Sequence, residues 1–148
     1  MGFKNYEPAR HEFVLNGGSF TFSVRGLSLQ DVSRLVNHHL PDLEALFNLF
    51  ARGAGNLDDN KFESLIMSLV SEAPGFAANL IALAADDPEG AEKAATLPFP
   101  TQVDAIMKIG DLTFVDVGGW GKGMERIAAL LNRTNVKAML PKGPVKAT

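Results

Sequence analysis

Two short runs of alternating residues near the start of the chain constrain the fold more than any other feature. They span residues 12–15 and 20–24, and apolar side chains such as Phe13 and Phe22 alternate along them. Between the runs lies Asn16-Gly17-Gly18, whose residues tolerate positive φ. This pattern predicts an antiparallel β-hairpin over residues 12–25. An isolated hairpin is marginally stable in water, so we expect its apolar face to pack on the rest of the chain.

After the hairpin, apolar residues recur at helical spacing. Ser28 is a good N-cap, and Asp31 lies in the first turn near the positive end of the helix dipole. The stripe expected to face the core there consists of Leu29, Val32, Leu35 and Val36. Pro41 opens a second helix. Further helices are predicted over about 58–72, from Pro74 to the Asp86-Asp87-Pro88 stop, over about 88–95, from Pro100 or Thr101, and over about 123–133. The fold class predicted is mainly α: a bundle of about six helices with an N-terminal β-hairpin.

The domain organisation predicted is simple, because 148 residues fit one domain. Residues 1–11 read as a polar leader, 12–133 as a single hairpin-plus-helical domain, and 134–148 as a flexible basic tail. Two segments resist a plain interpretation. Residues 112–117 are rich in β-branched side chains but have no partner strand nearby, and the glycines of 118–123 indicate a flexible break.

Composition excludes several classes of protein. The chain has no cysteine, so disulfides, thiolate metal sites and cysteine nucleophiles are excluded. A net charge of −3, with scattered lysines and arginines, does not favour nucleic acid as a partner. The first residues lack the apolar core of a signal peptide. No apolar run is long enough to span a bilayer, so no membrane partner is expected.

The sequence contains no candidate cofactor, metal or catalytic site. His38 and His39 are adjacent and point about 100° apart on a helix, so they cannot bind one ion together. We expect both to lie at a solvated helix end, where histidine complements the helix dipole. Residues 56–60 lack the spacing and the glycine of a calcium loop. Gly121-Lys122-Gly123 lacks the hydroxyl residue of a phosphate-binding loop, and no Gly-x-Ser-x-Gly nucleophile motif occurs. We therefore predict no enzyme activity, no catalytic residue, no cofactor and no metal.

A candidate protein-interaction surface lies near the end of the chain. Trp120 is flanked by glycines, which a monomer core rarely arranges, so we expect an exposed ring. The next helix carries an apolar face. The predicted surface for a client protein or for a second copy comprises Trp120, Met124, Ile127 and Leu131.

The order of segments resembles a known family. The hairpin is followed by Val24-Arg25-Gly26-Leu27-Ser28-Leu29-Gln30-Asp31 and by residues 35–47, Leu-Val-Asn-His-His-Leu-Pro-Asp-Leu-Glu-Ala-Leu-Phe. Later come residues 80–84, 97–106 and 109–114. Over about residues 12–133 this arrangement resembles the tail assembly chaperones of long-tailed bacteriophages, also called pre-tape-measure proteins.

The resemblance implies a role and partners. Such chaperones coat the tape measure protein and keep it soluble before the tail tube polymerises around it, in the cytoplasm of the host cell. Many have a frameshifted longer form, whose extension is thought to contact the tape measure or tail tube protein, and self-association into a homo-oligomer is a further expectation. Two alternatives stay open at this point: a phage tail structural or completion protein, and a helical regulatory protein with a basic tail.

Overall fold

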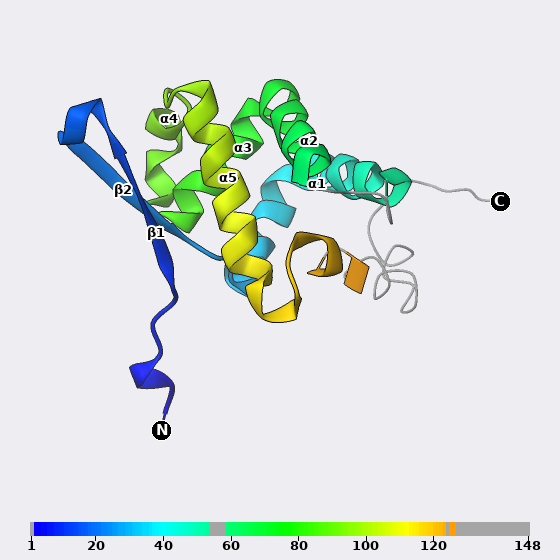
Figure 1. The fold of residues 1–148 in the computed structure, drawn as a ribbon, viewed down its shortest axis with the longest axis horizontal. Helices are drawn as coiled ribbons and strands as arrows, with labels where there is room; N and C mark the ends of the chain where they lie inside the picture. Colours follow the sequence, from blue (N-terminus) through cyan, green and yellow to red (C-terminus); the bar gives the residue numbers. More distant parts are fainter. Residues whose placement is uncertain (1, 54–58, 124, 127–148) are drawn as a thin grey trace.

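The predicted hairpin is present in the computed structural model, which describes residues 2–53, 59–123 and 125–126, without the side chains of 43, 45–53 and 59–62. Strand β1 (Arg10–Leu15) pairs antiparallel with β2 (Phe20–Arg25), and Phe13 lies opposite Phe22. The turn residues Asn16, Gly17 and Gly18 have φ of 54°, 66° and 101°. These left-handed conformations are the ones that asparagine and glycine adopt most readily. The hairpin packs beside α3 (Pro74–Ala84) and α5 (Phe99–Phe114) (Figure 1).

Helix α1 (Leu29–Gly53) joins the two helices predicted on either side of Pro41. Its start is closed by a capping box: the Asp31 amide donates to Ser28 Oγ at 3.2 Å, and the Ser28 amide donates to Asp31 Oδ2 at 2.8 Å. The helix bends at His39, which has φ −138° and ψ 35°. Proline removes a helical hydrogen bond and crowds the preceding turn, so the predicted boundary at Pro41 is a kink inside one helix.

The apolar stripe predicted for the start of α1 is divided between two faces. Leu35 is 2% exposed and Asp31 is 5% exposed, whereas Leu29 is 86% exposed and Val32 is 39% exposed. Residues four apart share a helical face, so burial of Asp31 and Leu35 turns Leu29 and Val32 toward solvent. The prediction that the whole stripe faces the core is therefore wrong.

The other helices follow the sequence closely. They are α2 (Asp59–Glu72), α3, α4 (Ala91–Ala94) and α5, with 3-10 turns η1 (Phe3–Asn5), η2 (Asn16–Gly18), η3 (Pro88–Gly90) and η4 (Val115–Val117). The ambiguous residues 112–117 are thus helical to Phe114 and then form η4. Within α5, Thr113 Oγ1 donates to the carbonyl oxygen of Ile109 at 2.6 Å, a bond that lets a β-branched hydroxyl residue fit a helix.

The glycine-rich break is shorter than predicted. Gly118 and Gly119 have φ of 100° and 102°, but residues 120–123 and 125–126 are helical again. The rest of the helix predicted over 123–133, and the tail predicted over 134–148, lie outside the described residues.

Helix α3 forms the centre of the core. It contacts α1, α2, α4, α5 and β2, and eight of its eleven residues are buried. The largest fully buried side chains are Phe76, Ile66, Ile81, Ile109 and Val24. The fold class predicted, mainly α with an N-terminal hairpin, is confirmed.

Within the described residues, no single helix is long and apolar enough to cross a membrane. Only α2 and α3 taken together, over Glu63–Glu72 and Pro74–Ala84, pass that test, and they are bent by 111°.

Candidate interaction site

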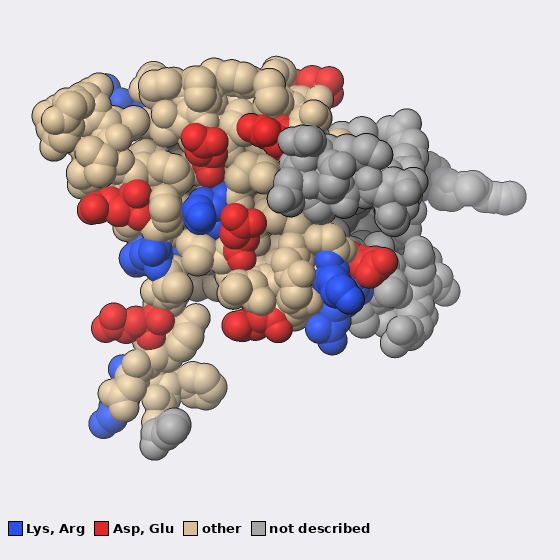
Figure 2. Space-filling model, viewed as in Figure 1, with Lys and Arg blue, Asp and Glu red and all other residues tan. Residues whose placement is uncertain are grey.

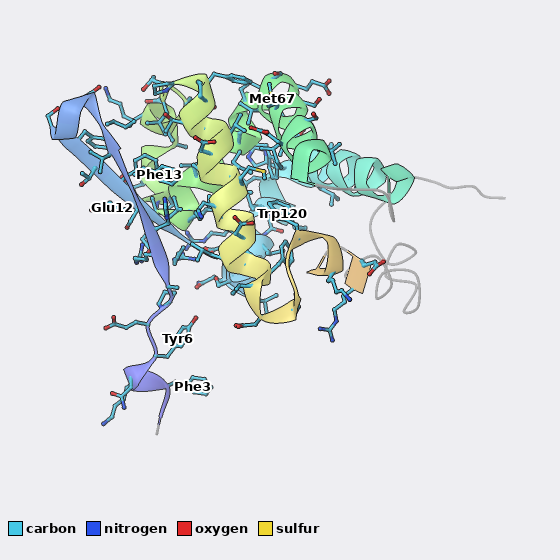
Figure 3. All side chains as sticks on the ribbon, in the orientation of Figure 1. Phe3, Tyr6, Glu12, Phe13, Met67 and Trp120 are labelled. Carbon is cyan, nitrogen blue, oxygen red and sulfur yellow. The ribbon has the colours of Figure 1, made fainter. Side chains whose placement is uncertain are left out.

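Trp120, the first residue of the predicted interaction surface, is partly buried rather than exposed. Its ring centroid lies 5.5 Å from that of Phe114, and its Nε1–H donates to the carbonyl oxygen of Met107 at 3.3 Å. The indole fills a slot over Gly110, where an added Cβ would come within 1.6 Å of the ring (Figure 3). The expectation of an exposed Trp120 was wrong because a glycine within α5 makes room for the indole.

The three other residues predicted for that surface are Met124, Ile127 and Leu131, and all lie outside the described residues. Whether they bind a partner stays a prediction. Gly123, the last described residue before Met124, is buried against Phe114, where an added Cβ would lie 2.1 Å from the ring.

Arg25, at the end of β2, joins the hairpin to two helix ends. Its Nη1 donates to Asp31 Oδ2 at 2.6 Å in the first turn of α1, and its Nη2 donates to Asp86 Oδ1 at 2.8 Å just after α3. Nη2 also donates to the carbonyl oxygen of Leu83 at 3.1 Å. Arg10, at the start of β1, forms a second ion pair with Asp86. We call Arg25, Asp31 and Asp86 the Arg25 clasp.

The charges of the clasp stabilise one another. Hydrogen bonds from Arg25 and then from Arg10 lower the pKa of Asp86 to about 2. Burial raises the pKa of Asp31, but hydrogen bonds from Arg25 and Ser28 outweigh it, so the pKa lies below the usual value. Hydrogen bonds to Asp31 and Asp86 raise the pKa of Arg25. All three groups are therefore charged at neutral pH.

The clasp places the start of α1 beside the end of α5. The Leu27 amide donates to Thr113 Oγ1 at 2.9 Å. Gly26 packs on α5 so closely that an added Cβ would lie 2.9 Å from the backbone of Leu112. Both contacts need the β2–α1 connection to run tightly over α5, which explains a glycine there.

Large apolar side chains are exposed at this same end of the molecule. Leu29 and Val115 lie two residues beyond the Leu27–Thr113 hydrogen bond, and they are 86% and 63% exposed. Val32 is one helical turn beyond Leu29 and is 39% exposed. We call Leu29, Val32 and Val115 the α1–α5 end surface. Exposed apolar side chains grouped in this way are typical of protein-binding surfaces.

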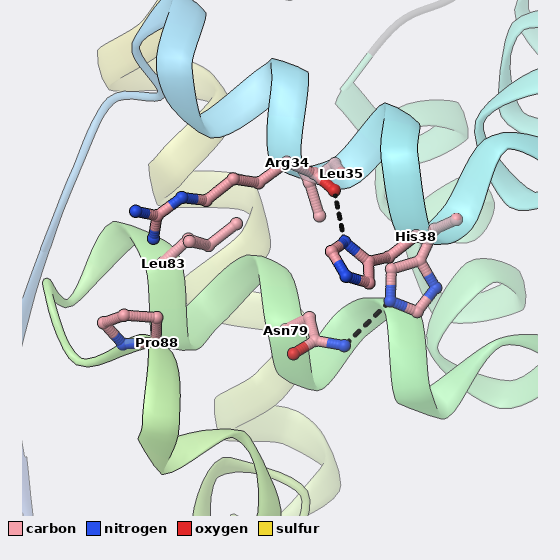
Figure 4. Close-up of a pocket in the computed structure, with 7 residues that line it drawn as sticks. Arg34, Leu35, His38, Asn79, Leu83 and Pro88 are labelled. Carbon is pink, nitrogen blue, oxygen red and sulfur yellow. Dashed lines mark hydrogen bonds between the residues drawn. The ribbon is translucent and has the colours of Figure 1, made fainter.

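A second candidate is a cleft of about 370 Å³ between α1 and α3 (Figure 4). Its lining residues are Arg34, Leu35, His38, His39, Asn79, Leu83 and Pro88, and we call it the α1–α3 cleft. Asn79 Nδ2 donates to His39 Nε2 at 2.8 Å, and His38 Nδ1 donates to the carbonyl oxygen of Arg34 at 3.0 Å. These bonds hold both histidines and Asn79 in place, and Leu35, Leu83 and Pro88 form the apolar part of the lining.

The two adjacent histidines have different surroundings. His38 is exposed, whereas His39 is partly buried at the kink, where its Nδ1 lies 3.3 Å from Asp42 Oδ2. The expectation that both sit at a solvated helix end therefore fails for His39. Among the described residues, no group of three or more His, Cys, Asp or Glu could hold a metal ion.

Charged side chains are mixed in sign over the face of the molecule shown in Figure 2. Acidic and basic groups alternate there with uncharged residues, which form the larger part of the visible surface. A face of this kind favours partners recognised by shape and apolar contact over partners gathered by a strong field of one sign.

Comparison with known proteins identifies one family. A family described as pre-tape measure protein matches residues 1–142, nearly the whole chain. The chain therefore belongs to the pre-tape measure protein family, which has a role in phage tail assembly. No curated protein and no solved structure matches the chain.

Gly110→Ala tests the slot that holds Trp120. The added methyl group must displace the indole, so we expect a loss of about 1–3 kcal/mol in the free energy of unfolding and a shift of tryptophan emission to longer wavelength. The chain has one tryptophan, so the emission reports on Trp120 alone. Gly75→Ala is the matched control, because an added Cβ there meets nothing within 4 Å. Unchanged emission in Gly110→Ala would contradict the described packing.

Arg25→Met tests the clasp. The substitution leaves the Asp31 carboxylate buried and unpaired, so we expect the free energy of unfolding to fall by about 3 kcal/mol in urea titrations. Arg10→Met is the control, because the side chains of Arg10 and Asp86 are 39% and 47% exposed, and exposed pairs contribute less than about 1 kcal/mol. Equal losses in the two variants would show that Arg25 has no special role.

Acid stability provides a separate test of Asp86. Because folding lowers its pKa to about 2, its contribution is present above the unfolded pKa, about 3.9. The contribution is lost as the pH falls toward 2. We expect the urea midpoint of the wild type to drop between pH 4 and pH 2, and that of Asp86→Asn to drop less. Asp31, whose pKa is also lowered, contributes to the pH dependence that remains in the variant. If the urea midpoints of the wild type and of Asp86→Asn fell equally between pH 4 and pH 2, the Asp86 ion pairs would not form.

Proposed function

We propose that this member of the pre-tape measure protein family binds the tape measure protein and keeps it soluble until the tail tube polymerises around it. The family match over residues 1–142 carries the proposal, because the role in phage tail assembly comes from it. That role is of a non-catalytic kind, and we propose that the protein works by binding alone. The proposed place of action is the cytoplasm of the host cell.

The α1–α5 end surface is the part of the described structure best suited to such a client. Leu29 and Val32 are three residues apart on one helix, and together with Val115 they offer exposed apolar side chains. A surface of this kind fits the apolar face of an amphipathic helix. Each contact is small, so many copies bound along one long client would hold it through multivalency rather than through one tight site.

The rigid placement of the end surface supports the same proposal. The capping box and the Arg25 clasp fix the first turn of α1, and the Leu27–Thr113 hydrogen bond fixes that turn against α5. A surface that is already ordered loses little conformational entropy when it binds. Contacts with the tail tube protein and between copies of this chain are further parts of the proposal.

Co-expression with the tape measure protein of the same phage tests the function. We expect the wild type to move the tape measure protein from the insoluble to the soluble fraction and to co-purify with it. No change in the soluble fraction would contradict the proposed role. Finding the chain in purified virions at a fixed stoichiometry would contradict a temporary escort and favour a tail structural protein.

Variants locate the surface. Leu29→Ser combined with Val115→Ser is expected to weaken binding of the tape measure protein by about tenfold or more, because burial of one leucine contributes about 1.5–3 kcal/mol. Both side chains are exposed, so the fold stays intact, which circular dichroism checks. Met67→Ser is the matched control, since Met67 is 42% exposed but lies on α2. Equal binding by the double variant and the control would exclude the end surface.

A further inference from the structure

Residues 2–9 form an arm that leads away from the base of β1 and from the helical body (Figures 1 and 3). Phe3 is 94% exposed and Tyr6 is 69% exposed, and of the whole arm only Pro8 is partly buried. The turn η1 is closed by the Tyr6 amide, which donates to the carbonyl oxygen of Phe3 at 2.9 Å. Side chains three apart in a 3-10 turn lie on the same side. The rings of Phe3 and Tyr6 project from the same side of the arm in Figure 3.

The arm is directed away from its own molecule. Tyr6 has extended backbone angles, φ −80° and ψ 131°. Glu7 precedes Pro8, which restricts it to extended conformations as well. Arg10 fixes the root of the arm through its ion pair with Asp86. The arm is therefore a stiff segment whose two exposed aromatic rings project away from their own molecule, where a partner can bury them.

The α1–α3 cleft has the size and chemistry to receive one of these rings. Its volume of about 370 Å³ lies in the range of pockets that hold a small ligand. Leu35, Leu83 and Pro88 supply apolar contacts, and Figure 4 shows the Arg34 side chain extending along the side of the cleft where Leu83 and Pro88 lie. A guanidinium beside an aromatic ring makes a favourable cation–π contact.

One charge of the arm can pair with one charge of the cleft. Glu7 is the only acid in residues 2–9 and directly follows Tyr6, whereas Lys4, the only basic side chain of the arm, lies two residues before Tyr6. The residues that line the cleft include Arg34 and two histidines but no carboxylate. Within the described part of the chain, Arg34 makes no ion pair. A Tyr6 ring in the cleft would place the next residue, Glu7, at the mouth of the cleft, which the long Arg34 side chain lines.

We infer that the arm of one copy docks in the α1–α3 cleft of a second copy, with Tyr6 in the cleft and Glu7 paired with Arg34. Each copy carries one arm and one cleft, so two copies related by a twofold axis satisfy both contacts at once. The cleft and the arm are separate from the α1–α5 end surface. Self-association through them therefore leaves the proposed client surface open, and its test needs no client.

Fluorotyrosine NMR tests the inference on the whole chain. The chain has one tyrosine, so 3-fluorotyrosine labelling gives one signal that reports on Tyr6. We expect the signal to shift with protein concentration, and the shift to disappear in Arg34→Glu. A signal that never responds to Arg34→Glu would overturn the inference. A signal that responds to Arg34→Glu equally at every concentration would place the arm in its own cleft, and would also overturn it.

Sedimentation equilibrium supplies the second readout. We expect a mass that rises with concentration from 15.9 kDa toward twice that value. Tyr6→Ser and Arg34→Glu should each raise the dimer dissociation constant by about tenfold or more. Glu7→Arg combined with Arg34→Glu should return the dissociation constant to the wild-type value, because the ion pair is re-formed with its charges exchanged. Phe99→Ser is the matched control, since Phe99 is 43% exposed and lies outside both the arm and the cleft.

Mixing two defective variants separates exchange between copies from any general loss of association. Tyr6→Ser keeps a working cleft, and Arg34→Glu keeps a working arm. Mixed together, they are expected to form a heterodimer with one intact arm–cleft contact, and this heterodimer should be tighter than the dimer of either variant alone. A wild type that stays monomeric would overturn the inference. So would a dimer whose dissociation constant is unchanged by both substitutions.

Discussion

The ion pair between Arg25 and Asp31 holds together the parts of the molecule on which its surfaces depend. The two side chains are 13% and 8% exposed, and they connect the last residue of the hairpin to the first turn of α1. Through Leu83 and Asp86 the same arginine reaches the end of α3. A cation at a helix C-terminus and an anion at a helix N-terminus both complement the helix dipoles. One side chain thus fixes where the hairpin ends, where α1 begins and which face of α1 turns inward.

The features predicted correctly from sequence are those whose cause is local. Asn16-Gly17-Gly18 specifies the hairpin turn, Ser28 specifies the start of α1, and the proline at 74 specifies the start of α3. The features that were predicted wrongly, or not at all, have a non-local cause. Nothing near Leu29 shows that Asp31 is drawn inward by an arginine six residues earlier, and Asp86, 61 residues from Arg25, has no pattern that identifies its partner.

The position of Trp120 at the candidate site also has a non-local cause. Its flanking glycines favoured an exposed ring, but the glycine that decides its position is Gly110, on a different element. A glycine in the middle of α5 was the signal, since glycine inside a helix is unfavourable unless something approaches closely. The exposed side chains of the end surface were visible in the sequence only as members of an ordinary apolar stripe.

The described part of the molecule is an ordered scaffold on which the end surface is distinct from the arm and the cleft. The end surface lies where α1 starts and α5 ends, and the arm and cleft lie at the root of the hairpin and between α1 and α3. Membership of the pre-tape measure family gives the chain its role in tail assembly, and this division suits the proposed binding of many copies along one long client. The most direct test is hydrogen–deuterium exchange of the chain with and without its tape measure protein. We expect slower exchange over residues 27–33 and 113–117 when the client is bound. A bound client that leaves exchange in both segments unchanged would contradict it.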